Sequence, residues 1–164
     1  MDNTLATQNN IILTDAYQRQ FSYLRLSITD LCNFKCSYCL PNGYQGKSSQ
    51  DELSLDEIKT LVASFAELGF KKIRLTGGEP SLRKDLLDII AICKSQAGIE
   101  KVCITTNGYR LNHFLPQWIE AGIDQVNISI DSLSPEQFEL ITSSSDLPMI
   151  MAALHSAMDN GFNA

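Results

Sequence analysis

Short β-forming segments alternate with amphipathic helical segments along the chain, and this alternation limits its possible folds more than any other feature. The β-forming segments lie at residues 21–29, 71–76, 101–106 and 124–131. Helical segments follow at residues 54–69, 84–96, 112–122, 134–141 and 147–161, and Pro116 is expected to interrupt the third. Parallel neighbouring strands need a crossover connection, which a helix usually supplies. The pattern therefore predicts an α/β fold, with a parallel sheet and helices outside it.

Residues that can carry chemistry lie where the predicted strands end. Three cysteines follow the first strand, "GGEP" follows the second, "TNG" follows the third, and "SID" ends the fourth. The loops after the carboxyl ends of parallel strands meet at one edge of the sheet. We therefore expect one functional site at this edge.

The segment "CNFKCSYC" holds Cys32, Cys36 and Cys39 with the spacing C-x3-C-x2-C. Cysteine thiolates hold iron–sulfur clusters, and three of them on a four-iron cluster leave one iron open to a substrate or cofactor. The alternatives are a zinc site with a distant fourth ligand and, least favoured because three cysteines cannot pair internally, a disulfide. His113 and His155 lie in helical segments without ligand-like spacing, so an iron–sulfur cluster is the preferred interpretation.

Cys93 and Cys103 require a separate interpretation. Cys93 lies on the apolar stripe of a predicted helix, and Cys103 lies within a predicted strand. A buried free cysteine behaves as a small hydrophobic residue. We therefore predict that both pack in the core.

Composition and charge disfavour nucleic-acid-binding, membrane-spanning and secreted proteins. The net charge of −6 and the pI near 4.8 disfavour nucleic-acid binding through the overall field. No apolar run approaches the roughly 18 residues of a membrane span. The polar N-terminus lacks a signal-peptide core, and residues 1–20 are predicted to be disordered. Five cysteines without a secretion signal indicate a reducing, cytoplasmic location.

The motifs resemble those of a known superfamily. "CNFKCSYC" resembles the signature of radical S-adenosylmethionine (SAM) enzymes, whose three cysteines bind a four-iron, four-sulfur (4Fe–4S) cluster. "TGGEP" is similar to the glycine-rich segment that contacts the methionyl amino group of SAM in that superfamily. Together with "YLRLSITDLCNFKCSYCLP", "KKIRLTGGEP", "TTNG" and "VNISIDSL", these motifs resemble the GTP 3′,8-cyclase family of molybdenum cofactor biosynthesis. The resemblance runs from about Phe21 to the last residue and implies a partial TIM-type barrel, the radical SAM core.

The resemblance also implies roles for particular residues around SAM. The cluster ligands would be Cys32, Cys36 and Cys39, and no residue is singled out as a catalytic acid, base or nucleophile. Tyr38 would lie against the adenine side of SAM. Gly78 would present its backbone to SAM, because a side chain there would block close approach. Ser129 would also touch SAM, although it could equally be an ordinary strand residue.

For the substrate, the resemblance matches Arg25, Arg74 and Thr105 to positions that contact GTP. An inward-facing arginine is costly unless paired, and a triphosphate would pair it through bidentate contacts. The alternatives are a salt bridge to Glu79 or Asp131, a solvent-facing position, and an ordinary strand role for Thr105. Glu79 is interpreted as a carboxylate beside the SAM ammonium group, with a structural role as the alternative.

In the family, the cluster reduces SAM to a 5′-deoxyadenosyl radical, which abstracts the 3′ hydrogen of GTP before the ribose radical attacks C8 of guanine. The resemblance therefore implies GTP as the substrate and a reducing electron donor such as flavodoxin. It also implies a downstream partner, cyclic pyranopterin monophosphate synthase, and a homodimer.

The chain departs from the family pattern in length. A complete barrel of this type needs about 250 residues, whereas this chain of 164 residues ends at "GFNA", where a fifth strand is expected. The family's C-terminal cysteine triad, which holds a second 4Fe–4S cluster, and its double-glycine tail do not occur here. We expect residues 21–164 to form the N-terminal half of a radical SAM barrel domain that is inactive alone. We also expect it to be oligomeric, aggregation-prone or partly disordered near 145–164. The alternatives are another radical SAM enzyme, such as a peptide modifier, and a non-catalytic fragment that binds a cluster or SAM.

Overall fold

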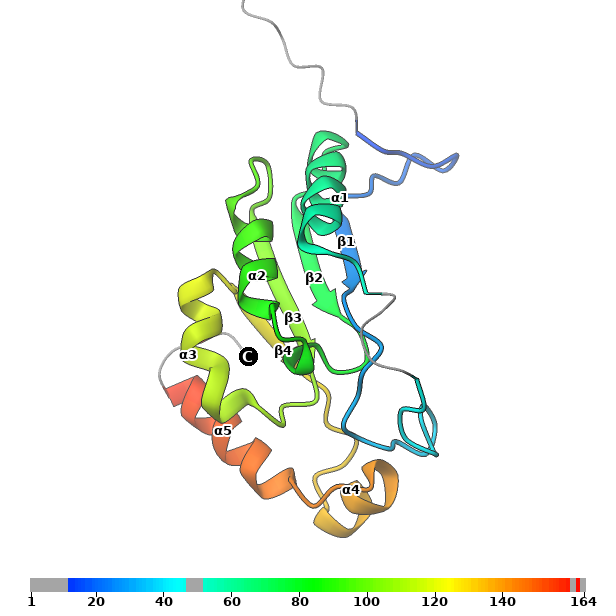
Figure 1. Ribbon diagram of the computed structural model, residues 1–164, viewed down its shortest axis with the longest axis vertical. Coiled ribbons are helices and arrows are strands. Elements are labelled where there is room, and N and C mark those ends of the chain that lie inside the picture. The colour runs from blue at the N-terminus through cyan, green and yellow to red at the C-terminus, as the bar shows by residue number, and fades with distance from the viewer. Residues whose placement is uncertain (1–11, 47–51, 160–161, 163–164) are drawn as a thin grey trace, which may run out of the picture.

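Four parallel strands form one sheet in the order β1-β2-β3-β4, so each strand lies beside its neighbour in sequence (Figure 1). The computed structural model describes residues 12–46, 52–159 and 162. Its strands are β1 (Tyr23–Ser27), β2 (Lys72–Thr76), β3 (Lys101–Thr106) and β4 (Gln125–Ile128). Its helices are α1 (Leu55–Glu67), α2 (Leu86–Ser95), α3 (Leu111–Ala121), α4 (Pro135–Thr142) and α5 (Leu147–Asp159), with a short 3-10 helix, η1 (Pro80–Leu82). The predicted α/β alternation is confirmed, and η1 is an addition to it.

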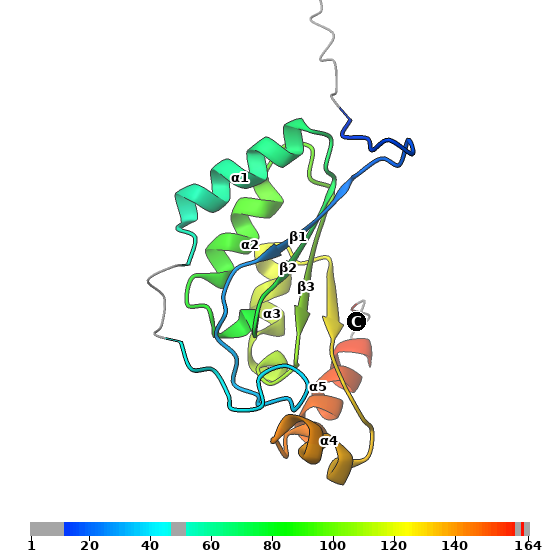
Figure 2. The same ribbon diagram turned by 90° about the vertical axis from the view of Figure 1, so that its right-hand side faces the viewer.

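One face of the sheet is apolar and supports the helices. The register aligns Leu26 with Leu75, Leu75 with Ile104, and Ile104 with Val126, so these side chains share one face. All four are buried, and α1, α2 and α3 cover this face (Figure 2). Full burial of such a side chain contributes about 1.5–3 kcal/mol. The main core therefore lies between the sheet and these three helices.

The opposite face of the sheet is polar. Arg25 aligns with Arg74, Arg74 with Cys103, and Cys103 with Gln125. Cys93 lies in the main core as predicted, whereas Cys103 is buried on the polar face, where its thiol lies 3.8 Å from Oε1 of Gln125. The prediction of core packing therefore holds for Cys93, and for Cys103 only its burial is confirmed.

Local signals set the starts of two helices. Ser54 and Glu57 form a capping box at the start of α1, and Ser134 caps α4. The predicted interruption at Pro116 is wrong, because α3 runs through it without a break. Leu111, which is buried like Trp118 further along α3, helps to hold the helix against the core, so the loss of one backbone donor does not end it.

Two smaller features complete the description. Residues 12–20 form a turn closed by an antiparallel bridge between Thr14 and Gln20, and the rest of the segment predicted to be disordered, residues 1–11, lies outside the described residues. Within the described part of the chain, no helix has the length and apolar character needed to cross a membrane.

Candidate cofactor and substrate site

The three clustered cysteines lie on the connection between β1 and α1, here called the cysteine loop (residues 28–54). A tight turn carries Cys36 and Cys39, since the carbonyl of Cys36 accepts hydrogen bonds from the N–H groups of Cys39 and Leu40, both at 2.9 Å, and Cys32 precedes this turn. Cys32 and Cys36 are half-buried and Cys39 is exposed. The loop follows the carboxyl end of β1, so the cysteines lie at the predicted edge of the sheet.

All five cysteines are free thiols. Burial raises the pKa of the Cys32 thiol, and the nearby charges of Glu79 and Cys39 raise it further. Burial also raises the pKa of Cys36, with smaller contributions from Asp131 and Cys32. The thiols therefore share one electrostatic neighbourhood and would release protons on binding metal.

The donor set is compatible with a 4Fe–4S cluster. The three thiols of Cys32, Cys36 and Cys39 are the soft ligands that such a cluster requires. In the described residues, no three His, Cys, Asp or Glu side chains converge as ligands of one ion. Ligands of a 4Fe–4S cluster each bind a different iron atom, so they need not converge on one point.

The "GGEP" segment binds the start of the cysteine loop through backbone hydrogen bonds. The N–H of Gly78 donates to the carbonyl of Thr29 at 2.8 Å, and the N–H of Glu79 donates to that of Leu31 at 2.6 Å. A Cβ atom on Gly78 would collide with the carbonyl oxygen of Leu31 and lie 2.7 Å from that of Asp30. The structure thus adds a second reason for glycine at 78, beside the predicted approach to SAM.

Gly77 has a similar role that sequence reasoning missed. Its φ of +152° is rarely adopted by other residues, and a Cβ there would collide with the backbone of Thr29. The only hint of this role in the sequence was the position of Gly77 directly before Gly78.

The carboxylate of Glu79 is buried and hydrogen-bonded within the protein, rather than accessible to a ligand. It is 0% exposed, and its oxygens accept hydrogen bonds from the N–H of Ser81 at 2.9 Å, the hydroxyl of Thr106 at 2.7 Å and the N–H of Asn107 at 2.6 Å. Three donors occupy most of the acceptor capacity of a carboxylate. This arrangement favours the structural alternative for Glu79.

Side-chain hydrogen bonds join the loops that follow different strands. Nδ2 of Asn107, after β3, donates to Oδ1 of Asn33 at 2.8 Å. The hydroxyl of Tyr38 donates to Oδ1 of Asp131, after β4, at 2.9 Å, and this bond raises the pKa of Tyr38 well above its usual range. Sequence reasoning did not foresee either contact, although the "TNG" and "SID" motifs pointed to both loops. They bring the ends of β1, β3 and β4 together as one site.

The residues predicted to contact SAM lie at this edge. Tyr38 is 69% exposed, and Ser129 is exposed just beyond β4, where its N–H donates to the carbonyl of Thr106 at 2.9 Å. Gly78 lies directly after β2. The structure brings these residues to the same edge as the cysteines, and their contacts with SAM remain predictions.

The residues predicted to contact GTP lie on the polar face below that edge. Nη1 of Arg74 lies 3.4 Å from Oγ1 of Thr105, and its guanidinium carbon lies 5.8 Å from the Tyr23 ring centre. Nε of Arg74 is buried without a hydrogen-bond partner, and Arg25, one strand away, is exposed. Among the described residues, neither arginine forms a salt bridge to Glu79 or Asp131. An anionic ligand on this face would meet the guanidinium groups of Arg25 and Arg74.

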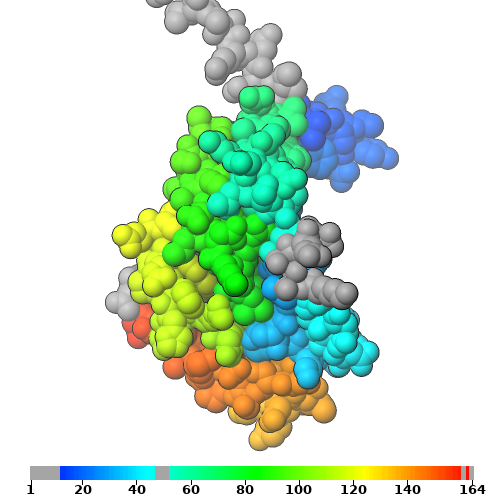
Figure 3. All heavy atoms as spheres, in the orientation of Figure 1, coloured from blue at the N-terminus to red at the C-terminus, as the bar shows by residue number. Residues whose placement is uncertain are grey.

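The cysteine loop also rests on α4. The N–H groups of Lys35 and Ser37 donate to the carbonyls of Thr142 at 3.0 Å and Ile141 at 2.8 Å. Figure 3 shows the loop, in blue, beside α4, in orange. A second apolar cluster of Phe34, Phe138, Leu147 and Ile150 lies between them.

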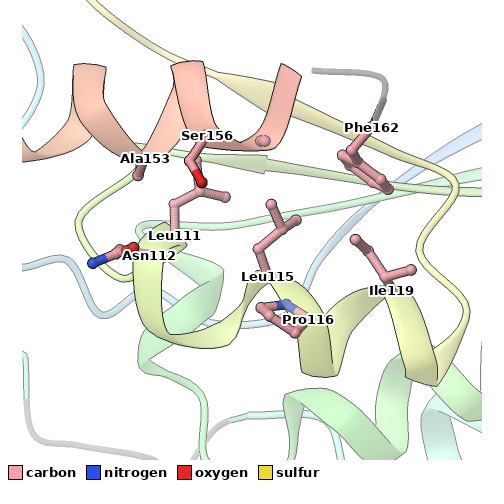
Figure 4. A pocket seen from close by; sticks show the side chains of 9 residues that line it. Leu111, Asn112, Leu115, Pro116, Ile119, Ala153, Ser156 and Phe162 are labelled. Atoms are coloured by element: carbon pink, nitrogen blue, oxygen red, sulfur yellow. The ribbon is translucent and has the colours of Figure 1, made fainter. Parts of the chain in front are cut away.

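A separate apolar cavity of about 460 Å³ lies between α3 and α5 (Figure 4). None of the residues that line it is a predicted site residue. They are Leu111, Asn112, Leu115, Pro116, Ile119, Ala153, Ser156, Ala157 and Phe162. The cavity is therefore distinct from the cysteine site.

Comparison with known proteins gives a family model, curated relatives and solved structures that are similar to this chain. The model of the radical SAM superfamily matches residues 26–164. The chain is 54% identical over 152 residues to a GTP 3′,8-cyclase of Tolumonas auensis, covering 93% of this chain and 45% of the relative. It is 52% identical over 152 residues to that of Cronobacter sakazakii, covering 92% and 46%. The FeFe-hydrogenase maturase HydG from Carboxydothermus hydrogenoformans shares the fold, with a TM-score of 0.69 and 20% identity over 85% of this chain and 34% of HydG.

Proposed function

Because the chain belongs to the radical SAM superfamily, we propose that its cysteine loop binds the 4Fe–4S cluster and that the whole protein is a GTP 3′,8-cyclase. The observation that carries this proposal is that the cysteine loop and the "GGEP" turn lie together at one end of one sheet, whose polar face carries Arg25 and Arg74. The chain spans about half the length of the curated relatives that it matches. The cyclase activity is therefore proposed for the whole protein.

The two cofactors predicted from sequence, a 4Fe–4S cluster and SAM, are those of the superfamily, so this prediction is confirmed. For the individual ligands we propose Cys32, Cys36 and Cys39, which lie within one eight-residue stretch of the cysteine loop. When bound, the cluster supplies the electron for reductive cleavage of SAM, which provides the radical for hydrogen abstraction. A second cluster belongs to the whole protein in this proposal.

The protein's own residues bind and orient the reactants in this proposal. Tyr38 and Ser129 are both exposed, and in this proposal they contact SAM together with the backbone of Gly78. The Tyr38–Asp131 hydrogen bond limits the positions that the aromatic ring can take. No acid–base residue is assigned.

GTP is the proposed substrate, held by Arg25, Arg74 and Thr105. The support comes from the relatives' printed activity and from the charge of the polar face. Arg74 has a buried Nε without a partner, and a phosphate oxygen would supply one. The further partners proposed for the whole protein are a flavodoxin-type electron donor, the downstream synthase and a second copy of the chain.

Anaerobic reconstitution with iron and sulfide tests the cluster assignment. We expect close to one 4Fe–4S cluster per chain, with loss of the cluster in Cys36→Ala. Cys93→Ala is the matched control, because Cys93 is fully buried in the main core and is not one of the three clustered cysteines. Loss of the cluster in Cys93→Ala but not in Cys36→Ala would contradict the ligand assignment.

A second experiment tests the activity. The whole protein, reduced with SAM present, should release 5′-deoxyadenosine and convert GTP to a cyclised product, which chromatography detects. Release of 5′-deoxyadenosine without conversion of GTP would favour another radical SAM reaction.

A further inference from the structure

Arg83 is a buried arginine directly after η1, and all of its donor-bearing nitrogens are used. Its side chain is only 4% exposed. Nη1 donates to the carbonyl of Ile28 at 2.5 Å, and Nη2 donates to the carbonyl of Leu53. Nε donates to Oδ1 of Asp85 at 2.7 Å, and Nη2 reaches Oδ2 at 3.2 Å.

The two carbonyls that Arg83 binds are the two ends of the cysteine loop. Ile28 is the residue at which the chain leaves β1, and Leu53 lies two residues before α1 begins. A second contact closes the loop at the same place, because the hydroxyl of Thr29 donates to Oε1 of Glu52. One guanidinium therefore joins two points that lie 25 residues apart and enclose all three clustered cysteines.

Asp85 supports this interpretation independently. It occupies the N-cap position of α2, yet its side chain makes no capping hydrogen bond. An N-cap aspartate usually stabilises its helix by about 1 kcal/mol. Here the carboxylate instead forms a bidentate pair with Arg83, and this pairing lowers the pKa of Asp85.

An ion pair whose arginine is buried and whose carboxylate is partly exposed is a weak source of stability by itself. Desolvation of the two charges offsets most of their attraction, and well-packed apolar side chains often replace such pairs without loss. An apolar side chain, however, cannot bind two carbonyls. The planar fork of arginine can bind both while it is oriented by a carboxylate, which a lysine cannot do.

We propose that Arg83 is a positioning residue, which closes the base of the cysteine loop and thereby holds Cys32, Cys36 and Cys39 in the arrangement that the cluster needs. The inference rests on the proposed function, because it assigns the loop to cluster binding. The "GGEP" turn and Arg83 then form one support: the turn binds the carbonyls of Thr29 and Leu31, and Arg83 binds those on either side of the loop.

Iron release from the reconstituted chain tests the proposal. Arg83→Met removes the donors at similar length, and Arg83→Lys keeps the charge but loses the fork. We expect an iron chelator, added anaerobically, to bleach both variants at least about tenfold faster than the original chain, since hydrogen bonds from a charged group are lost. Arg83→Lys carries the test if Arg83→Met does not fold.

Lys94→Met is the matched control. Lys94 also forms a partly buried ion pair, to Asp124 at 2.6 Å, but Asp124 precedes β4, at the opposite end of the sheet from the cysteines. This variant should lower the melting temperature without changing the rate of iron release. Equal acceleration in Lys94→Met and Arg83→Met at similar melting temperatures would overturn the proposal, as would unchanged release in both Arg83 variants.

Amide hydrogen exchange on the iron-free chain separates this proposal from the proposed function. Arg83→Met should increase exchange at the loop amides of Lys35, Ser37 and Cys39 at least about fivefold, and Lys94→Met should not. If the original chain binds no cluster, the proposed function fails while exchange still decides whether Arg83 closes the loop. Unchanged exchange at these amides would overturn the closing role itself.

Discussion

Substitution of Gly78 by alanine should damage both the fold and the cluster site, because the space for a side chain is filled by backbone. The new Cβ atom would collide with the carbonyl of Leu31 and lie 2.7 Å from that of Asp30. Neither atom belongs to a flexible side chain, so the cysteine loop itself must move. The loop would shift immediately before Cys32, the first of the predicted ligands.

The size of the effect follows from these contacts. Overpacking of this kind costs about 1–3 kcal/mol. The hydrogen bonds from Gly78 to Thr29 and from Glu79 to Leu31 would weaken, at about 1 kcal/mol each. A total of roughly 3–5 kcal/mol corresponds to a fall in melting temperature of roughly 6–20 °C for a chain of this length.

The assay has two parts, thermal unfolding of the iron-free chain and iron content after anaerobic reconstitution. Gly78→Ala should reduce both. Gly98→Ala is the control, because Gly98 has a φ of +92° but open space around it, and a Cβ atom there would lie 3.9 Å from its nearest neighbour. It should lose stability through backbone strain alone and keep its iron. An unchanged melting temperature with full iron content in Gly78→Ala would refute the steric argument.

Three further predictions concern separate parts of the chain. The pKa of Asp85 lies below its ordinary value of 3.8, so its pairing with Arg83 stabilises the fold above about pH 4 and is lost as the pH falls through the folded-state pKa. The difference in unfolding free energy between the original chain and Asp85→Asn, measured in urea, should therefore shrink between pH 5 and pH 3, and a constant difference would contradict this. Burial raises the pKa of Cys93 to about 12, so brief alkylation at pH 8 followed by peptide mapping should label exposed Cys39 and spare Cys93; equal labelling would refute its burial. Strands β1 and β4 are the two edges of the sheet, so light scattering should show association of the isolated chain, and a monodisperse monomer would count against open edges.

The fold was largely predictable because its signals are local. Alternating apolar positions such as Ile73 and Leu75 are enough to indicate a strand, and Ser54 with Glu57 is enough to indicate a helix start. The alternation of side chains along β3 also indicated the face on which Cys103 lies. Cys103 shares the polar face with Thr105, whereas Ile104 points into the core. Pro116 shows the limit of a local rule, since tertiary packing of α3 outweighs one missing hydrogen bond.

The residues of the site were predictable from the sequence, but the contacts that hold them in place were not. Spacing alone pointed to Cys32, Cys36 and Cys39 as a group. The backbone partners of Gly78 and of the Arg83 side chain, however, lie between 30 and 55 residues earlier in the chain, and only the folded arrangement of the strands brings them together. No periodic pattern in a sequence indicates which distant backbone carbonyl a residue will bind.

The contacts between the cysteine loop and α4 have a consequence for the order of events during synthesis. Each strand pairs with the strand made just before it, so the sheet can grow as the chain emerges from the ribosome. The amides of Lys35 and Ser37, however, bind carbonyls of residues 142 and 141, and Tyr38 binds Asp131. At about 5–20 residues per second, these partners appear roughly 5–20 seconds after the cysteines. The thiols therefore emerge well before their surroundings are complete, and the nascent chain passes through an interval in which they are open to oxidation and to the wrong metal.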